Sequence, residues 1–277
     1  MVFVSVVIPT FNRAKKVTRA ISSVLYQTFS DYEVIVVDDG STDETPEALS
    51  RFGRRITYLP HATNRGVSAA RNTGIRASRA PFIAFLDSDD YWLPGKLAAQ
   101  ISFFSDHPRA VLCQTEEIWI RKGRRVNPQK KHLKPEGDIF EPSLKRCLVS
   151  PSAVMLKRPL LERVGLFDEA LPACEDYDLW LRIACRYPVY LIREHLVVRE
   201  SGSPDQLSIR HKGMDRFRIH ALVGLIKKGV LDERQLKAAQ EELSLKCRIY
   251  GNGCLKRGRL QEGAQYLGLP HRIMEYL

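Results

Sequence analysis

Short hydrophobic runs alternate with longer amphipathic segments over the first hundred residues of the chain. The runs are continuous and rich in β-branched residues, as is typical of strands that helices cover on both faces. This alternation predicts βαβ units and a parallel sheet. The predicted strands are residues 2–8, 33–37, 56–59 and 82–86, and the predicted helices are residues 13–27, 44–52 and 67–78.

The pattern changes after Pro94, where strands and helices alternate less regularly. The elements up to residue 196 are expected to complete the sheet, and the chain beyond Asp205 is expected to be helical. One apolar stripe in this tail is more often core than membrane anchor, and it consists of Phe217, Ala221, Leu222, Leu225 and Ile226. We predict helices at 96–105, from 139, at 177–185 and at 233–250, and strands at 110–120, 153–156 and 189–196.

The composition is that of a soluble globular protein, with 44% hydrophobic and 27% charged residues. The longest apolar runs are too short to cross a bilayer and no basic region precedes the first, so we expect neither a spanning helix nor secretion. The six cysteines form no CxxC pair, which argues against a zinc site or a disulfide framework and favours a reducing cytoplasm. The formal net charge of +11 favours an anionic partner.

One segment, residues 121–134, holds seven Lys or Arg and no acidic residue. It fits either a solvated surface hairpin or a basic lip that meets an anionic acceptor or a membrane surface. No aromatic residue is interleaved with these charges, and the acidic loops elsewhere would repel phosphate in the absence of metal. We therefore expect no nucleic-acid partner.

Polar and acidic residues follow three of the predicted strands. The carboxyl ends of parallel strands meet at one edge of the sheet, where ligands of open α/β folds bind, so these loops are predicted to converge on one crevice. Any one loop, taken alone, could equally consist of turns and helix caps. The residues are Pro9, Thr10 and Asn12 after the first strand, Asp38 and Asp39 after the second, and Asp87, Ser88 and Asp89 after the fourth.

The segment FIAFLDSDD places three carboxylates within four residues at the end of a buried strand. Their mutual repulsion is costly unless a cation or a hydrogen-bond donor lies among them. Mg²⁺ and Mn²⁺ prefer oxygen ligands, and proteins often hold Mg²⁺ with one or two carboxylates plus substrate phosphates. The spacing of Asp87 and Asp89 suits such a site, because alternate residues of an extended segment point to the same side.

Five segments in this order resemble the family 2 glycosyltransferases of the GT-A fold: VSVVIPTFNR, EVIVVDDGSTDET, NRGVSAARNTGI, FLDSDD and CEDYDLWLR. The resemblance implies an α/β fold with a mostly parallel, Rossmann-like sheet flanked by helices. It implies a glycosyltransferase domain at residues 1–207, with a nucleotide-binding half at about 1–93 and an acceptor half at about 94–207, and a helical C-terminal appendage at 208–277.

Several residues acquire expected roles toward a nucleotide-sugar donor from the same resemblance. Pro9, Thr10 and Phe11 would line the nucleotide pocket, with Phe11 placed to stack on the base. Asp38 and Asp39 would hold the base or ribose, which suits a uridine or thymidine nucleotide because a carboxylate can accept from an imide N–H or a ribose hydroxyl. One of these two could instead only cap a helix.

The remaining donor-side roles concern the phosphates and the metal. The resemblance implies that Arg71 lies near the donor's base or phosphates, where small neighbours allow close approach. Asp87 and Ser88 would contact the nucleotide sugar. Asp87 and Asp89 would bind Mn²⁺ or Mg²⁺ against the diphosphate.

Asp176, in the segment CEDYDLW, occupies the position at which the family places its catalytic base. A carboxylate at a helix N-terminus is stabilised as an anion and can accept the acceptor's hydroxyl proton. The implied reaction is a single displacement at the anomeric carbon with inversion and no covalent enzyme intermediate. The structural alternative is that Glu175 and Asp176 only cap the helix, and Trp180 could either floor the sugar site or pack in the core.

One departure from the family pattern concerns the metal. Many GT-A enzymes carry a histidine ligand after the catalytic helix, but the text here is ESGSPDQLS, with Ser203 at the expected position. Serine is a poorer ligand for a divalent ion, so Glu200, His195 or His211 would have to substitute. A catalytically silent nucleotide-sugar-binding scaffold is therefore the alternative, although Asp87, Asp89 and Asp176 are retained. A nucleotidyltransferase fits less well, because PTFNRAKK lacks the glycines of a triphosphate-binding loop.

The expected partners are a nucleotide-sugar donor, for which we expect a UDP-sugar, and a glycan or lipid-linked acceptor. Family likeness points to the synthesis of surface polysaccharide or glycolipid. We expect a cytoplasmic protein with peripheral contact at the inner face of the membrane.

Overall fold

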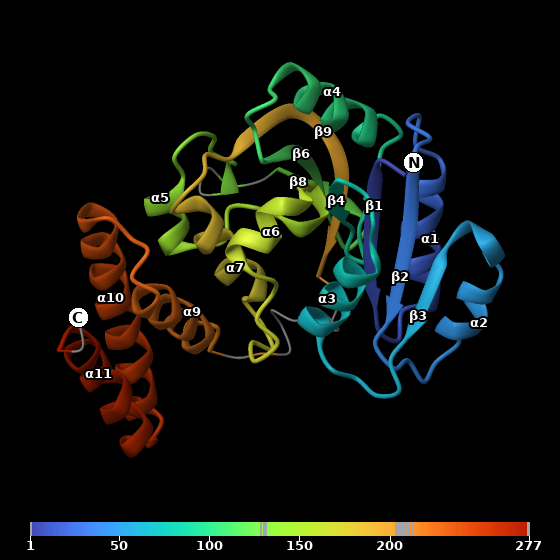
Figure 1. Cartoon of the computed structure of the whole chain (residues 1–277). Helices are drawn as coiled ribbons and strands as arrows, with labels where there is room; N and C mark the ends of the chain where they lie inside the picture. Colours follow the sequence, from blue (N-terminus) through green and yellow to red (C-terminus); the bar gives the residue numbers. More distant parts are fainter. Residues whose placement is uncertain (1, 128, 130–131, 203–210, 212, 276–277) are drawn as a thin grey trace.

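The computed structural model of the chain describes residues 2–127, 129, 132–202, 211 and 213–275 (Figure 1). In the described part, nine strands form one sheet in the order β3-β2-β1-β4-β8-β6-β9-β5, with β7 paired to β6 outside this path. Helices cover both faces of this sheet, and three more helices lie to one side (Figure 1). This is the α/β architecture that the sequence predicts.

The first half of the sheet is parallel throughout. It consists of β1 (Val4–Thr10), β2 (Tyr32–Asp38), β3 (Thr57–Pro60) and β4 (Phe82–Phe85). The connecting helices are α1 (Ala14–Leu25), α2 (Thr45–Ser50) and α3 (Val67–Ala77), with a 3₁₀ turn at Gly53–Arg55. All seven strands and helices are predicted by the sequence, to within a few residues at their ends.

Alternate residues of β1 pack against different helices. Ile8 faces the buried side of α1, where Ile21 and Val24 belong to the same apolar cluster. Val7 faces the other way, toward α3. At Gly74 a Cβ atom would lie 2.4 Å from Cγ1 of Val7, so the close approach of α3 to the sheet requires glycine at this position.

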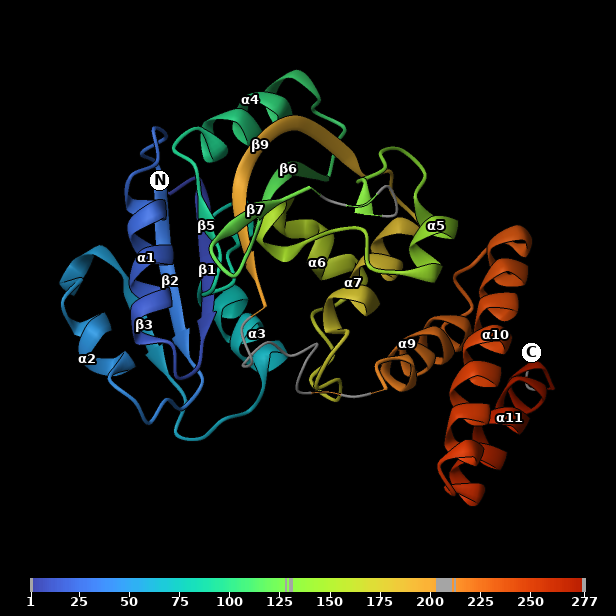
Figure 2. The ribbon, with the colours of Figure 1, turned by 180° about the vertical axis from the view of Figure 1, so that it is seen from behind.

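The second half of the sheet is mixed in direction. Strand β8 is antiparallel to both β4 and β6, whereas β6 and β9 run parallel. Two short strands, β5 and β7, and helix α6 are missing from the sequence prediction; Figure 2 shows both strands from the opposite side. The elements are β5 (Tyr91–Trp92), α4 (Lys96–Asp106), β6 (Leu112–Arg121), β7 (Arg124–Val126), α5 (Phe140–Lys145), a 3₁₀ turn (Pro151–Ala153), β8 (Val154–Lys157), α6 (Arg158–Val164), α7 (Glu175–Ala184) and β9 (Tyr190–Ser201).

Strand β9 is longer than predicted and strongly curved (Figure 1). Its pairing with β6 is interrupted by register shifts around Glu116, and such irregularities bend a strand. Its far end pairs with β5, at Val197 and Val198. The curvature therefore carries the last residues of β9 to the loop that follows β4.

The C-terminal helices are α9 (Asp215–Lys227), α10 (Glu233–Lys256) and α11 (Leu260–Met274). The predicted apolar stripe on α9 is buried and shares one core cluster with residues of α5, α7 and α10, so the prediction that it is core is confirmed. Helix α10 ends six residues later than predicted, and α11 was not predicted as a separate helix. The predicted boundary between residues 207 and 208 lies outside the described residues, and the division into domains stays a prediction. Among the described helices, none has the combination of length and apolar composition that crossing a membrane requires.

Candidate active site

A polar cavity of about 220 Å³ opens where β1 and β4 end and where α3 and α7 begin. The cavity thus lies at the carboxyl ends of the strands, where the sequence predicts the binding edge. Loops after β1 and β2 lie side by side here, because Asn12 accepts from the N–H of Thr42 at 2.7 Å and Asp39 donates its N–H to Thr10 O at 2.9 Å. The predicted site residues that line the cavity are Pro9, Arg71, Asp87, Ser88, Asp89 and Asp176.

Arg71 bridges two carboxylates inside the protein. Its Nη2 lies 2.7 Å from Oδ1 of Asp87, and its Nη1 lies 2.7 Å from Oε1 of Glu175. The residue is only 3% exposed, and its guanidinium also lies over the Phe167 ring. Both ends of the guanidinium fork are therefore occupied by protein, so Arg71 connects the end of β4 to the start of α7.

Burial also affects Glu175 itself. Desolvation and the adjoining charge of Asp176 raise the pKa of Glu175 to about 7, against the opposing effect of Arg71. Desolvation alone would lower the pKa of Arg71, but the two carboxylates outweigh it and raise that pKa above its usual range. Arg71 thus stays cationic, while Glu175 titrates near neutral pH.

The other two carboxylates of the FLDSDD segment have different partners. Asp89 Oδ2 lies 3.2 Å from Nη1 of Arg13. Asp90 is buried and accepts from the hydroxyl of Ser152 at 2.6 Å and from the N–H of Glu200 at 3.1 Å. Burial, together with the neighbouring carboxylates, raises the pKa of Asp90 well above its usual range, and burial also raises that of Asp89. These contacts hold the loop after β4 against the end of β9.

Asp176 lies in the first turn of α7 and is partly exposed to the cavity. Its Oδ1 accepts from the N–H of Tyr177 at 2.7 Å, and its Oδ2 accepts from the thiol of Cys147 at 3.4 Å. The helix begins two residues earlier than predicted, so Glu175 and Asp176 both lie within its first turn, where the helix dipole favours an anion. Trp180 is buried against Phe167. Of the two roles expected for Trp180, the structure thus shows packing in the core.

Asp38 and Asp39 are buried and are not among the described residues that line the cavity. Asp38 accepts from the N–H of Ser41 at 3.0 Å and from the hydroxyl of Tyr58 at 3.2 Å. Asp39 accepts from the N–H of Gly66 at 2.8 Å, at the N-terminus of α3, and has two further partners. In this arrangement Asp39 holds the start of α3, which corresponds to the capping alternative for one of the two aspartates.

The three predicted nucleotide contacts in the loop after β1 differ from one another in their position relative to the cavity. Pro9 lines the cavity and Thr10 is buried, with its hydroxyl oxygen lacking a hydrogen-bond partner in the described structure. Phe11 is partly exposed and lies outside the described lining of the cavity. The structure thus brings Pro9 to the cavity directly and leaves Phe11 at the edge of the loop.

Three charged residues of the cavity lining were missed by the sequence reasoning, namely Arg13, Asp90 and Arg199. Arg13, at the end of the segment PTFNR, lines the cavity beside Asp89, and its place in that motif was the available signal. Asp90 lies next to the predicted metal ligands. Arg199 carried no sequence signal, because its approach to the site depends on the curvature of β9. Ser152, which donates to Asp90 from outside the described lining, carried none either.

A divalent cation fits the donor atoms of this cavity only if the substrate completes its coordination. Asp87 and Asp89 each use one oxygen for an arginine, and among the described residues no side chain donates a hydrogen bond to the second oxygen of either carboxylate. Across the described ranges, no group of three or more His, Cys, Asp or Glu is arranged to hold a metal ion. Two carboxylates plus phosphate oxygens is the arrangement that Mg²⁺ commonly adopts.

The candidate substitutes for the family histidine are separated in space. Ser203 lies outside the described residues. Glu200 lines the cavity and pairs with Arg19 at 2.6 Å. His195 is exposed on β9 and His211 packs edge-on against Phe217; neither belongs to the described cavity lining.

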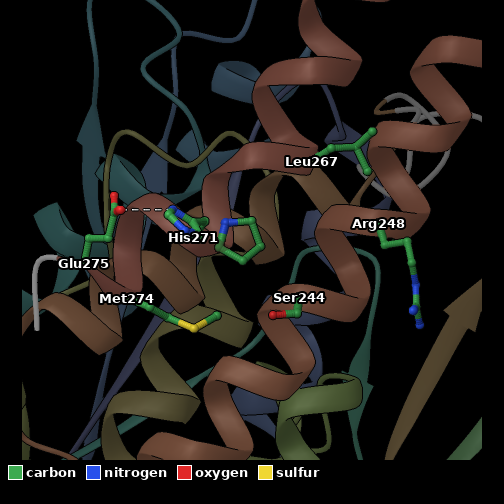
Figure 3. Close-up of a pocket in the computed structure, with 7 residues that line it drawn as sticks. Ser244, Arg248, Leu267, His271, Met274 and Glu275 are labelled. Atoms are coloured by element: carbon green, nitrogen blue, oxygen red, sulfur yellow. Dashed lines mark ion pairs between the residues drawn. The ribbon is translucent and has the colours of Figure 1, made fainter.

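A larger hollow of about 570 Å³ lies far from these carboxylates, between α10 and α11 (Figure 3). Leu267 and Met274 contribute its apolar wall, and His271 pairs with Glu275 at 3.2 Å. None of the predicted site residues lines this hollow. The chemistry-bearing residues are therefore in the smaller cavity at the end of the sheet.

Solved structures share this architecture. The structure of TarS residues 1–349 from S. aureus in complex with UDP-GlcNAc matches 98% of this chain and 81% of that chain, with a TM-score of 0.78 and 19% sequence identity. A mannosyltransferase from Pyrobaculum calidifontis, in complex with GDP-Man and Mn²⁺, matches with a TM-score of 0.61, covering 98% of this chain and 84% of that one at 19% identity. The fold is therefore the GT-A type of glycosyltransferase fold that the motifs predict.

Sequence relatives point the same way. An uncharacterised glycosyltransferase of Rickettsia prowazekii is 32% identical over 199 residues, which are 70% of this chain and 62% of that protein. The Escherichia coli enzyme WfgD, a UDP-Glc:alpha-D-GlcNAc-diphosphoundecaprenol beta-1,3-glucosyltransferase by name, is 35% identical over 181 residues, 65% of this chain and 69% of the enzyme. The chain thus spans about 62% of the length of the Rickettsia relative. A family model described as glycosyl transferase family 2 matches residues 5–165, more than half of the chain, and the chain belongs to that family.

Proposed function

We propose that this protein transfers a sugar from a nucleoside-diphosphate sugar to an acceptor hydroxyl, with inversion at the anomeric carbon. One observation carries the proposal: Asp176, at the start of α7, and Asp87, at the end of β4, line one cavity. A group that accepts a proton and a group suited to a metal–diphosphate complex thereby lie on two sides of one space.

The donor site comprises the cavity residues from the first half of the sheet. Pro9 and Ser88 would contact the nucleotide, and Asp38 and Asp39 would act on the base or ribose from behind the loop. Arg71 would act through Asp87, since its two terminal nitrogens pair with Asp87 and Glu175. A UDP-sugar is the proposed donor, supported by the printed activity of the E. coli relative and by the UDP-GlcNAc complex of TarS.

The reaction we propose is a single displacement. Asp176 accepts the proton of the acceptor hydroxyl as that oxygen bonds to the anomeric carbon and the nucleoside diphosphate leaves. Mg²⁺ or Mn²⁺ held by Asp87 and Asp89 would neutralise charge that grows on the leaving diphosphate. Arg13, which pairs with Asp89, adds a guanidinium group to the cavity lining and stabilises the same anion electrostatically.

The proposed acceptor is a lipid-linked glycan. Two E. coli relatives are named for transfer to GlcNAc-diphosphoundecaprenol, which supports this acceptor class. The exposed basic strand β7, with Arg124 and Arg125, would then face the headgroup region of a membrane at its cytoplasmic side. We propose peripheral contact there.

Calorimetric titration of a panel of nucleotides and nucleotide sugars, with and without Mn²⁺, tests the donor site. We expect a uridine diphosphate to bind more tightly than guanosine or adenosine diphosphates, and Mn²⁺ to strengthen that binding. Binding without turnover in the presence of a broad acceptor panel would support the silent-scaffold alternative. Absence of binding to every nucleotide would contradict the proposed function.

A further inference from the structure

A second cavity, of about 140 Å³, adjoins the first and is also lined by Asp176. The two cavities share the side chains of Asp87, Asp176 and Arg199. The rest of the second cavity is lined by β6, by the segment after β7 and by residues 147–151. A molecule in this second space would therefore reach Asp176 while the first cavity holds the donor.

Trp119, on β6, is held in a fixed position in this wall. Its indole N–H donates to Oε2 of Glu117 at 3.1 Å. The guanidinium of Arg199 lies over the indole, 5.2 Å from the ring centroid, and the imidazole of His132 lies 5.0 Å from it. The ring is only partly buried, so it presents a rigid aromatic surface within the cavity lining.

Glu117 and Lys134 form the support beneath that ring. Lys134 Nζ lies 3.2 Å from Oε1 of Glu117, and the two side chains are only 8% and 2% exposed. Lys134 also donates to Thr115 O at 3.0 Å. Lys134 is the last residue of the basic segment 121–134, so one end of that segment is anchored inside the protein while Arg124 and Arg125 remain exposed.

Arg199 is a cation of the cavity lining that can interact with a ligand. Its side chain is exposed, and within the described chain it stacks on Trp119 but forms no ion pair. Desolvation by the surrounding side chains lowers the pKa of Arg199, but the carboxylates of Glu117, Asp90 and Asp87 outweigh this effect and raise it, so the charge is retained. Its N–H groups can therefore donate to a ligand.

The charges of this cavity suit a neutral, hydroxyl-rich ligand better than an anion. Lys134 offsets Glu117 and Arg71 offsets Asp87, which leaves the carboxylate of Asp176 opposite the guanidinium of Arg199. A phosphate beside Asp176 would be repelled. A sugar ring offers hydroxyls for both charged groups and C–H faces for an aromatic wall.

We propose that the second cavity is the acceptor subsite and holds one sugar ring of the acceptor, packed against Trp119, with one hydroxyl on Asp176 and another accepting from Arg199. This inference rests on the proposed function, because Asp176 is the base there. It makes Trp119 and Arg199 specificity-determining residues for the acceptor and not for the donor.

The test uses the full chain, the uridine diphosphate sugar found by titration, and GlcNAc diphosphate carrying a short alkyl chain as acceptor. We expect Trp119→Ala and Arg199→Ala each to raise the acceptor KM by about tenfold or more. Trp119→Phe keeps an aromatic wall and should recover most of the loss. Arg193→Ala, an exposed site on the same strand, is the matched control.

Two further readouts separate this inference from the proposed function. Nucleotide affinity and the slow release of uridine diphosphate in water should be unchanged in Trp119→Ala, which also shows that the variant is folded. The alanine variants should also bind the alkyl glycoside of GlcNAc, which lacks the diphosphate, more weakly than the wild type, by the same factor as for the diphosphate acceptor. Three outcomes would each overturn the acceptor subsite: an unchanged acceptor KM in both alanine variants, lost nucleotide binding in Trp119→Ala, or an effect confined to the diphosphate acceptor. A wild-type chain that binds no nucleotide would instead contradict the proposed function itself.

Discussion

Arg71 and Asp87 lie 2.7 Å apart in an ion pair whose arginine side chain is only 4% exposed. The same guanidinium reaches Glu175, so one buried cation joins the loop that carries the proposed metal ligands to the helix that carries the proposed base. The positions of Asp87 and Asp176 relative to each other therefore depend on a residue that need not touch the substrate.

We expect Arg71→Met to lower the free energy of unfolding by about 3–5 kcal/mol, because it leaves two carboxylates without their cation. Urea denaturation measures this loss. Arg76→Met, on the same helix but with an exposed pair to Glu169, should cost less than about 1 kcal/mol. Equal losses in the two variants would show that the buried bridge does not stabilise the fold.

Asp176→Asn should lower kcat by about two to four orders of magnitude while nucleotide binding stays intact, because asparagine cannot accept the proton. Steady-state kinetics and calorimetry measure the two quantities separately. Asp106→Asn changes an exposed aspartate outside the cavity and is the control. A variant that no longer binds nucleotide would show that Asp176 belongs to the donor site.

Asp89→Ala should abolish the strengthening of nucleotide binding by Mn²⁺, a loss of about tenfold or more, because one of the two carboxylates proposed to hold the ion is removed. Titrations of the same variant without Mn²⁺ should match the wild type. Asp106→Ala is the matched control. The metal site would be refuted by a variant that keeps its full response to Mn²⁺.

Glu175 should make stability fall as pH rises from about 4.5 to about 7. Burial raises its pKa from 4.5 to about 7 in the native protein, so within this window the native state binds more protons than the unfolded state. Relative to Glu175→Gln, the free energy of unfolding of the wild type should therefore fall across this range. Above about pH 7 the difference between the two proteins should stay constant. Urea unfolding at several pH values measures the difference, and Glu194→Gln, at an exposed position, should show none.

Lys96 should show the opposite dependence. It is fully buried, donates to Gln100 Oε1 at 2.6 Å, and its pKa is lowered by burial from 10.5 to about 7. Between these values the unfolded state binds more protons, so the wild type should gain stability relative to Lys96→Met as pH rises from about 7 to 10. Denaturation curves for the two proteins that stay parallel over this range would contradict the expectation, and Lys228→Met, at an exposed site, serves as control.

The sequence by itself determined the elements of the first half and the identity of the motif residues. Hydrophobic period and turn residues are local signals, so β1 to β4 and α1 to α3 could be predicted from neighbours in the chain. Asp87, Asp89 and Asp176 could be named because each stands in a short segment with a recognisable pattern. The short strands β5 and β7 left no such signal, since two or three residues cannot show a period.

Only the tertiary structure decided what these residues touch. Arg71 meets Glu175 across 104 positions of sequence, and Asp90 meets Glu200 across 110, because the curvature of β9 and the packing of α7 bring them together. Asp39 accepts from the N–H of Gly66 at the start of α3, although its local sequence predicts a ligand contact. Lys134 pairs with the buried Glu117, although its local sequence predicts an exposed loop. A buried charged group needs an opposite charge or a hydrogen-bond partner beside it, and here that partner is distant in the sequence.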